Sequence, residues 1–433
     1  MSRFPQVKEE KLGESYFKWQ HKSGLPIFVI PKKHSAAYAL LGTRYGSIDV
    51  KFKTERDADY LELPDGVAHF LEHKMFEDEN GVDAFSRYAQ TGASANAYTS
   101  FGRTCYLFSC TEGFEQNLEI LLDFVTHPFF SEATIQKEQG IIGEEIAMYD
   151  DNPGWCVFNN LLQALYVNHP VRRNIAGTRE SIAKITPEML YRCTDTFYNL
   201  RNMALVVCGD VTPEQVDAVC DKVLTKTAPE QTVERVFPEE PEEVNHSLAE
   251  AWFEVAQPVV EIGFKAVPPE TPEEAMRISA ANAITTQLLF GRSGEFYNRL
   301  YESGLINEKF GGGYMQMRGC AFTEVAAYCN DPKALLDALC KEIDYRREHY
   351  FTPEEFEAAR RVVYANNLFT FDSTEDIASA FMDHYLADED YMTCTALLSS
   401  IGYDEAREIF LRTIRTDRCS MSVVYPKDQE RNV

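Results

Sequence analysis

The chain has 433 residues, 45% of them hydrophobic, and a formal net charge of −26. That length exceeds one hydrophobic core and suits two domains of roughly 200 residues each, and the hydrophobic content excludes global disorder. The negative charge argues against a phosphate-binding surface, so we expect no nucleic-acid partner. Acidic clefts would favour neutral or basic peptides as ligands; the alternative is that the charge only keeps the protein soluble.

We expect no secretory signal, because residues 1–12 are charged and contain no apolar run. No stretch reaches the ~18 uninterrupted apolar residues that span a membrane, so no membrane partner is expected. The eleven cysteines form no Cys-x-x-Cys pair, which indicates reduced, mostly buried thiols and a cytoplasmic protein. We expect Cys105 and Cys110 in a buried strand rather than beside a metal.

The first half of the chain alternates strand-like runs with helical patterns. Strands are predicted at 24–31, 36–45, 93–99, 104–109 and 203–210, and a polar loop at 49–63. Helices are predicted directly after Gly66 and at 84–91, 114–125, 132–149 and 155–166, and from Thr186-Pro187 onwards. Asp65 is the expected N-cap of the helix that follows Gly66.

The composition changes between 225 and 247, where three prolines are interleaved with glutamates, as is typical of a linker. Beyond it, strands are predicted at 259–266 and 420–425, a hairpin at 310–328, and helices at 273–290, 295–302, 333–349, 353–371 and 404–415. The sequence therefore predicts a first domain at 1–228, a linker at 229–248 and a second domain at 249–433.

The two halves resemble each other in places, as a duplicated unit would. The resembling segments are 87–92 with 299–304, and 130–135 with 351–356. When the alignment of 130–135 with 351–356 is continued along the chain, Glu138 corresponds to Ala359 and Glu145 to Asn366. The helix 280–285, which would correspond to the helix after Gly66, contains no histidine. Only the first copy keeps acids and imidazoles, which favours a chemical over a structural role for them.

The helix after Gly66 carries His-x-x-Glu-His, formed by His69, Glu72 and His73. Residues four apart project from one helix face, so both imidazoles aim at one point, as in a zinc site, and a nearby carboxylate can take a proton from water. Glu138 and Glu145 are seven apart on the helix 132–149 and share a face. The alternative for these two acids is a solvated acidic stripe.

These residues resemble the pitrilysin/insulysin (M16) family of zinc metallopeptidases, the inverzincins. The resemblance runs from about Gly24 to the C-terminus, and the length is similar to that of the short bacterial processing-peptidase-like members. It rests on Gly66-x-x-His69-x-x-Glu72-His73, Asn96-Ala97-Tyr98-Thr99, Thr104-x-Tyr106, Glu138-(x6)-Glu145, Gly177, Asn202-Met203 and Gly209-Asp210. It implies an α+β fold of two homologous α/β sandwich domains, each a sheet with helices packed on one face, forming a clamshell.

The resemblance also implies roles for individual residues. His69, His73 and Glu145 would bind Zn²⁺, and Glu72 would be the general base that activates water. Glu138 would hold a ligating histidine in place, with a plain ion pair as the alternative.

Asn96 and Ala97 would pair with the backbone of an extended substrate, although Asn96 is also compatible with an ordinary strand residue. The histidines without ligand spacing are expected to be ordinary: His21, His34, His127, His169, His246, His349 and His384.

One departure concerns the second domain, where active family members place an Arg and a Tyr. Tyr301 and Asn307 stand at those positions, and Arg299 and Tyr314 are the candidates to replace them. The sequence predicts a zinc-dependent endopeptidase that cleaves peptides or small unstructured proteins. The alternatives are a subunit of a heterodimeric peptidase or scaffold whose activity depends on a paralogous partner, and a dedicated peptide-precursor maturation protease. The expected assemblies are a homodimer or a heterodimer with a paralogous subunit.

Overall fold

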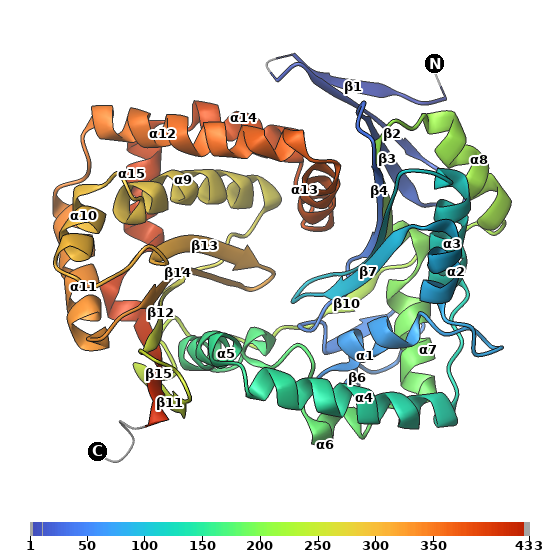
Figure 1. The fold of residues 1–433 in the computed structure, drawn as a ribbon, viewed down its shortest axis with the longest axis horizontal. Helices are drawn as coiled ribbons and strands as arrows, with labels where there is room; N and C mark the ends of the chain where they lie inside the picture. The colour runs from blue at the N-terminus through green and yellow to red at the C-terminus, as the bar shows by residue number, and fades with distance from the viewer. Residues whose placement is uncertain (1–2, 11, 428–433) are drawn as a thin grey trace. The chain divides into compact units, whose positions relative to one another are not determined.

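The computed structural model describes residues 3–10 and 12–427, so residues 1, 2 and 11 of the N-terminal stretch 1–12 lie outside the described part. The chain forms two compact units, each assembled from separate segments (Figure 1). Unit 1 comprises Met1–Glu144, Asn174–Val236 and Leu368–Met392, and unit 2 comprises Glu145–Arg173, Phe237–Asn367 and Thr393–Val433. These units differ from the continuous division 1–228, 229–248 and 249–433 expected from the sequence.

Unit 1 is built around a seven-stranded sheet in the order β1-β2-β3-β9-β4-β8-β7. Its strands are β1 (Gln6–Glu9), β2 (Glu14–Gln20), β3 (Pro26–Pro31), β4 (Ala37–Thr43), β7 (Ser94–Thr99), β8 (Thr104–Cys110) and β9 (Met203–Gly209). β3 and β9 are parallel and all other neighbours are antiparallel. β7 is an edge strand, so one side of its backbone is open to an added strand.

A second, three-stranded sheet in unit 1 corrects two expectations. It consists of β10 (Val233–Arg235), β5 (Lys51–Thr54) and β6 (Leu61–Glu62), in that order. The loop expected at 49–63 therefore contains two strands, and part of the expected linker is a third. These strands have only two to four residues and carry lysine, arginine and glutamate, so their apolar alternation was too short to recognise.

The helices of unit 1 cover both faces of its large sheet. They are α1 (Val67–Lys74), α2 (Ala84–Thr91), α3 (Phe114–Thr126), α4 (Glu132–Asp150), α6 (Arg179–Ile182), α7 (Pro187–Phe197), α8 (Pro213–Val223) and α13 (Thr374–Leu386), with η2 (Leu200–Asn202) and η3 (Phe369–Asp372). α3 packs against β4 and β8, whereas α13 packs against β4 and β9. α13 was not predicted, and it comes from the second half of the chain.

Unit 2 contains a five-stranded sheet in the order β11-β15-β12-β14-β13. Its strands are β11 (Leu248–Phe253), β12 (Val259–Ala266), β13 (Gly311–Met317), β14 (Cys320–Tyr328) and β15 (Cys419–Pro426). Its helices are α5 (Pro153–Leu165), α9 (Pro272–Phe290), α10 (Glu295–Glu302), α11 (Pro332–Glu348), α12 (Pro353–Leu368), α14 (Tyr391–Ser400) and α15 (Tyr403–Thr413), with η1 (Pro170–Arg172) and η4 (Thr416–Arg418). Unit boundaries fall inside the continuous helices α4, α12 and α14.

The two sheets share one topology, which confirms the predicted pair of homologous domains. In β3-β9-β4-β8-β7 and in β11-β15-β12-β14-β13, the first pair is parallel and the next three pairs are antiparallel. Each sheet also carries a helix from the opposite half of the chain: α13 lies on β4 and β9, and α5 lies on β12 and β15. None of the described helices has both the length and the apolar composition needed to cross a membrane.

The entry into α1 is fixed by Gly66. Its φ of 91° is left-handed, and a Cβ there would lie 2.5 Å from the Ala176 carbonyl oxygen, so only glycine fits. Gly66 is the N-cap, without a side-chain cap, and the prediction of Asp65 as N-cap was wrong. Asp65 instead accepts a hydrogen bond at its backbone oxygen from the Ser181 hydroxyl (2.8 Å), which ties the start of α1 to α6.

Candidate active site

The two histidines of α1 lie side by side, as the i, i+4 spacing predicts. Their ring centroids are 4.6 Å apart with an interplanar angle of 59°. His69 and Glu72 are each only 8% exposed. The His73 side chain is 25% exposed, so α1 presents one buried imidazole, one buried carboxylate and one partly exposed imidazole.

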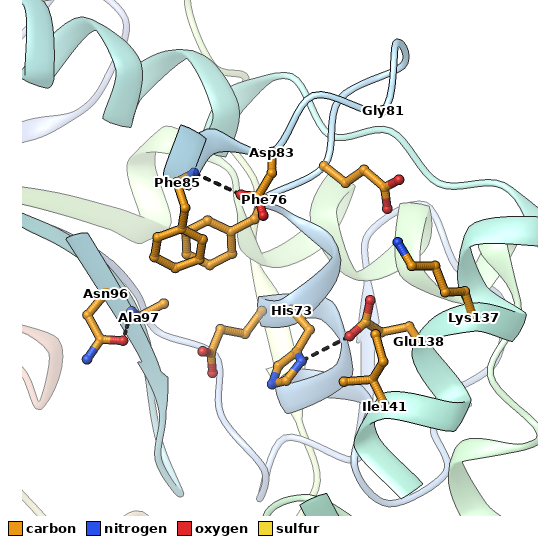
Figure 2. A pocket seen from close by; sticks show the side chains of 12 residues that line it. His73, Phe76, Gly81, Asp83, Phe85, Asn96, Ala97, Lys137, Glu138 and Ile141 are labelled. Atoms are coloured by element: carbon orange, nitrogen blue, oxygen red, sulfur yellow. Dashed lines mark hydrogen bonds and ion pairs between the residues drawn. The ribbon is translucent and has the colours of Figure 1, made fainter. Parts of the chain in front are cut away.

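Helix α4 brings two acids to these histidines. His69 and His73 each offer a ring nitrogen and Glu145 offers a carboxylate oxygen, and these three atoms lie within 4.8 Å of one another. Glu145 lies on α4 directly after the unit boundary, and Tyr149, one turn further, donates a hydrogen bond to its Oε1 (2.6 Å). Glu138 Oε1 accepts a hydrogen bond from His73 Nδ1 (3.1 Å), as Figure 2 shows.

This donor set fits zinc. Two imidazole nitrogens and one carboxylate oxygen are a common three-ligand set in catalytic zinc sites, where the fourth position stays open. Because Nδ1 of His73 is engaged by Glu138, its Nε2 is the nitrogen that remains for a metal. The three side chains fit a zinc ion on donor chemistry and on proximity.

A buried lysine accompanies Glu138. Lys74 is 1% exposed, and its Nζ lies 2.7 Å from Glu77 Oε2 and 4.0 Å from Glu138 Oε2. The hydrogen bond from Lys74 holds the pKa of Glu77 below its usual value. A buried ammonium needs such acidic partners, so Lys74 links the acids beside His73 into one charge network.

Glu72 is held by a different contact. The Thr99 hydroxyl at the end of β7 donates a hydrogen bond to Glu72 Oε2 (2.6 Å). Glu72 is not one of the three clustered ligand residues. It is therefore placed as an oriented carboxylate next to the group that fits a metal.

A cavity of about 400 Å³ opens beside these residues. Its lining comprises Glu72, His73, Phe76, Glu77, Gly81, Asp83, Phe85, Asn96, Ala97, Lys137, Glu138 and Ile141. Phe76 and Phe85 stack with centroids 4.4 Å apart, and Figure 2 shows their rings beside each other, with β7 on the other side of the cavity from Lys137 and Ile141. The cavity therefore combines one aromatic wall with polar and charged groups.

Asn96 and Ala97 line this cavity from the edge strand β7. The Ala97 backbone N–H donates to the side-chain Oδ1 of Asn96 (2.9 Å). An N–H on an open sheet edge is a natural donor for an added strand. Here the neighbouring side chain occupies that donor.

The two residues of unit 2 that differ from the family pattern, Tyr301 and Asn307, have local partners. Tyr301 is 48% exposed and stacks on Tyr297, and the Asn307 side chain accepts from the Lys309 backbone N–H. Arg299 forms an ion pair with Glu342 (2.6 Å). The buried Tyr314 hydroxyl has no hydrogen-bond partner among the described residues.

Sequence reasoning assigned no role to Thr99, Tyr149 or Lys74. Tyr149 was detectable in principle, because it stands four residues after Glu145 on one helix. Thr99 reaches Glu72 across 27 positions, a contact that no local pattern encodes. The two cysteines expected in a strand, Cys105 and Cys110, are buried in β8, and all eleven cysteines are free.

The chain is similar to known peptidases along nearly its whole length. The profile described as "Insulinase (Peptidase family M16)" matches residues 60–179, and that described as "Peptidase M16 inactive domain" matches residues 184–363. The "Uncharacterized zinc protease YmfH" of Bacillus subtilis is 36% identical, over 97% of this chain and 99% of that protein.

Solved structures extend the similarity to the fold. A putative M16-like peptidase from Alicyclobacillus acidocaldarius superposes with a TM-score of 0.91 at 32% identity, over 98% of this chain and 99% of that one. Pitrilysin superposes with a TM-score of 0.78 at 14% identity, over 99% of this chain and 47% of the pitrilysin chain. The second likeness concerns the fold alone, and this chain matches about half of pitrilysin.

Proposed function

Since this chain belongs to peptidase family M16, we propose that it is a zinc-dependent endopeptidase that cleaves peptides or small unstructured proteins. The observation that carries the proposal is the convergence of His69, His73 and Glu145, with Glu72 on the same helix turn but outside the ligand group. In this proposal the first three residues hold the metal and Glu72 moves the proton.

The metal would be held by His69 Nε2 or Nδ1, His73 Nε2 and a Glu145 oxygen. When bound, zinc supplies a Lewis acid that polarises the scissile carbonyl and acidifies a water molecule. Glu72 accepts a proton from the attacking water and passes it to the nitrogen of the leaving amine. The Thr99 hydroxyl keeps the Glu72 carboxylate oriented for both transfers.

Glu138 and Lys74 act through His73. By accepting from Nδ1, Glu138 selects the tautomer that leaves the other ring nitrogen free for the metal. Lys74 keeps negative charge on Glu138 and Glu77 favourable in a buried setting. Both are positioning residues in this proposal.

The substrate would bind as an added strand on β7. A carbonyl of the extended peptide would replace Asn96 Oδ1 as the acceptor for the Ala97 N–H. Backbone pairing of this kind selects extended conformation more than sequence. The stacked Phe76 and Phe85 would supply an apolar contact for one substrate side chain.

Substitution of Glu72 tests the proposal. Glu72→Gln should retain zinc and lose peptidase activity by roughly 10²–10⁴-fold, the range for loss of a general base. Glu79→Gln, which changes an exposed acid near the same motif, should leave activity unchanged. A Glu72→Gln protein as active as wild type, or wild-type protein that cleaves peptides without zinc, would falsify the proposal.

Dependence on a partner subunit is a second candidate, favoured by Tyr301 and Asn307 at positions where active members carry an Arg and a Tyr. If the chain requires a paralogue, the purified protein should bind zinc but cleave a peptide library only after the paralogue is added. If the chain alone elutes as a single size-exclusion peak and that peak cleaves the peptides, dependence on a paralogue is excluded. We also propose a cytoplasmic location, which the eleven free cysteines support.

A further inference from the structure

We propose that His384, Glu389 and Cys394 form a second metal site, which takes zinc or another borderline divalent cation. One ligand atom of each lies within 4.8 Å of the other two. Among the described residues, the only other group that meets this criterion is His69, His73 and Glu145. Nothing in the peptidase chemistry requires the second group.

The site is made by the turn that joins α13 to α14. α13 ends at Leu386 and α14 begins at Tyr391. Asp388 between them has a φ of 62°, the only positive φ of a non-glycine residue in the described chain. This turn folds the chain back, so that the Glu389 N–H donates to the His384 carbonyl (2.8 Å). A left-handed non-glycine residue persists only where its surroundings hold it.

Arg44 holds this turn in place. Its Nη2 donates to the Tyr385 carbonyl (2.7 Å) and to Asp388 Oδ1 (2.9 Å), and its guanidinium lies 4.6 Å from the Tyr385 ring centroid. These contacts offset the backbone cost at Asp388. They fix the segment from which His384 and Glu389 project.

The side chains of the group are already oriented toward one another. His384 Nδ1 lies 2.7 Å from Glu389 Oε2, and the imidazole stacks on Tyr391 with centroids 5.3 Å apart. The Glu389 side chain is 9% exposed and that of His384 is 28% exposed. Cys394 follows in the first turn of α14, two residues past the unit boundary on that continuous helix.

The donor set indicates the kind of cation. A thiolate, an imidazole and a carboxylate together suit zinc and related transition metals, whereas magnesium and calcium prefer oxygen ligands alone. On binding, the Cys394 thiol releases its proton to solvent, and any proton shared by His384 and Glu389 leaves the coordinating atom. From its sequence spacing, His384 was expected to have no ligand role. The spacing gave no signal because His384, Glu389 and Cys394 approach one another only through the turn at Asp388.

A cation here would clamp the end of α13 to the start of α14. α13 contributes Ile377, Phe381 and Met382 to the core on one face of the unit 1 sheet. Fixing its C-terminal end therefore stabilises the helix that covers that face. We assign the second site a structural role that is separate from peptide hydrolysis.

Cobalt reconstitution of the full chain tests this assignment, because Co²⁺ bound by a thiolate has a sulfur-to-metal charge-transfer band in the near ultraviolet. The proposed active site contains no sulfur ligand, so the band does not arise there, and its loss in Cys394→Ser assigns it to the second site. We expect two Co²⁺ per wild-type chain together with the band. Cys394→Ser should lose the band and one ion while keeping peptidase activity, and Cys156→Ser, a matched change of a partly buried cysteine, should lose neither.

The opposite pattern should appear when the proposed active site is removed. His69→Asn with His73→Asn should keep one Co²⁺ and the full band while losing peptidase activity. A wild-type chain without the band, or a band that persists in Cys394→Ser, overturns the second site. Absence of the band from the wild-type spectrum overturns the second site even if Cys394→Ser fails to fold, and this outcome leaves the proposed peptidase activity intact.

Discussion

Glu138→Gln isolates the contribution of the charge beside His73. The glutamine amide has nearly the same shape and keeps a carbonyl oxygen, so it can still accept from His73 Nδ1, which lies 3.1 Å from Glu138 Oε1. Lys74 keeps its 2.7 Å partner Glu77 and loses only the charge 4.0 Å away. The fold should therefore survive, and zinc binding should weaken.

The expected size of the effect follows from the hydrogen bond. A hydrogen bond to a charged acceptor contributes about 1.5–3 kcal/mol, and one to a neutral acceptor about 0.5–1.5 kcal/mol. The difference, about 1–1.5 kcal/mol, corresponds to roughly tenfold weaker binding. That is the lower end of the about 10–100-fold cost of losing an outer partner of a metal-binding histidine, as expected for a contact of 3.1 Å.

The assay measures the free zinc concentration that restores half of the peptidase activity to metal-free protein in a chelator buffer. This readout reports the catalytic metal alone. Glu144→Gln is the matched control, because Glu144 lies on the same helix with its side chain 82% exposed and paired to Arg179. The reasoning is refuted if Glu138→Gln needs no more zinc than wild type, or no more than Glu144→Gln.

Three further perturbations test other parts of the structure. Thr99→Val removes the 2.6 Å hydrogen bond to Glu72, so turnover should fall about tenfold with an unchanged zinc requirement; unchanged turnover would count against the orienting role. Gly66→Ala places a Cβ 2.5 Å from a backbone oxygen at a φ of 91°, which should lower the free energy of unfolding by about 1–3 kcal/mol, seen as a lower Tm. Burial, aided by Glu324, raises the pKa of Glu261 to about 8 from 4.5. The folded state therefore keeps a proton that the unfolded state loses, and stability falls as the pH rises through that window. Glu261→Gln should flatten the fall in Tm between pH about 5 and about 8, and an unaltered pH profile would contradict the shift.

Much of the fold was predictable because its signals are local. Helical periodicity and capping located α2, α7, α9 and α10 within a few residues, and Thr186, at the predicted start of α7, is its N-cap. The spacing of His69 and His73 fixes their proximity on any helix. Proximity of Glu145 could be inferred only with the family resemblance, because its own helix gives no sign of which element it faces.

The remainder depends on contacts between distant segments. Glu72 meets Thr99, and His73 meets Glu138 across 65 positions, so their geometry follows from tertiary packing. α13 was missed although its Ile377, Phe381 and Met382 are buried. The 3-10 helix η3 before it and the turn at Asp388 after it leave no clear start or stop signal in the sequence. The N-cap of α1 was wrongly assigned for the same reason: the left-handed Gly66 takes this position, packed against the backbone of the distant Ala176.

Because helices are exchanged between the halves, neither compact unit is formed by one half of the chain alone. On β4, a Cβ at Gly42 would lie 2.6 Å from Met382 Sδ of α13, and on β12, the matching strand, a Cβ at Gly263 would lie 2.6 Å from Leu165 of α5. Glycine therefore allows close packing of the exchanged helix at both places. The unit that carries His69, Glu72 and His73 therefore includes α13 from the second half of the chain, which packs on β4 and β9 and contributes none of the residues clustered with His69.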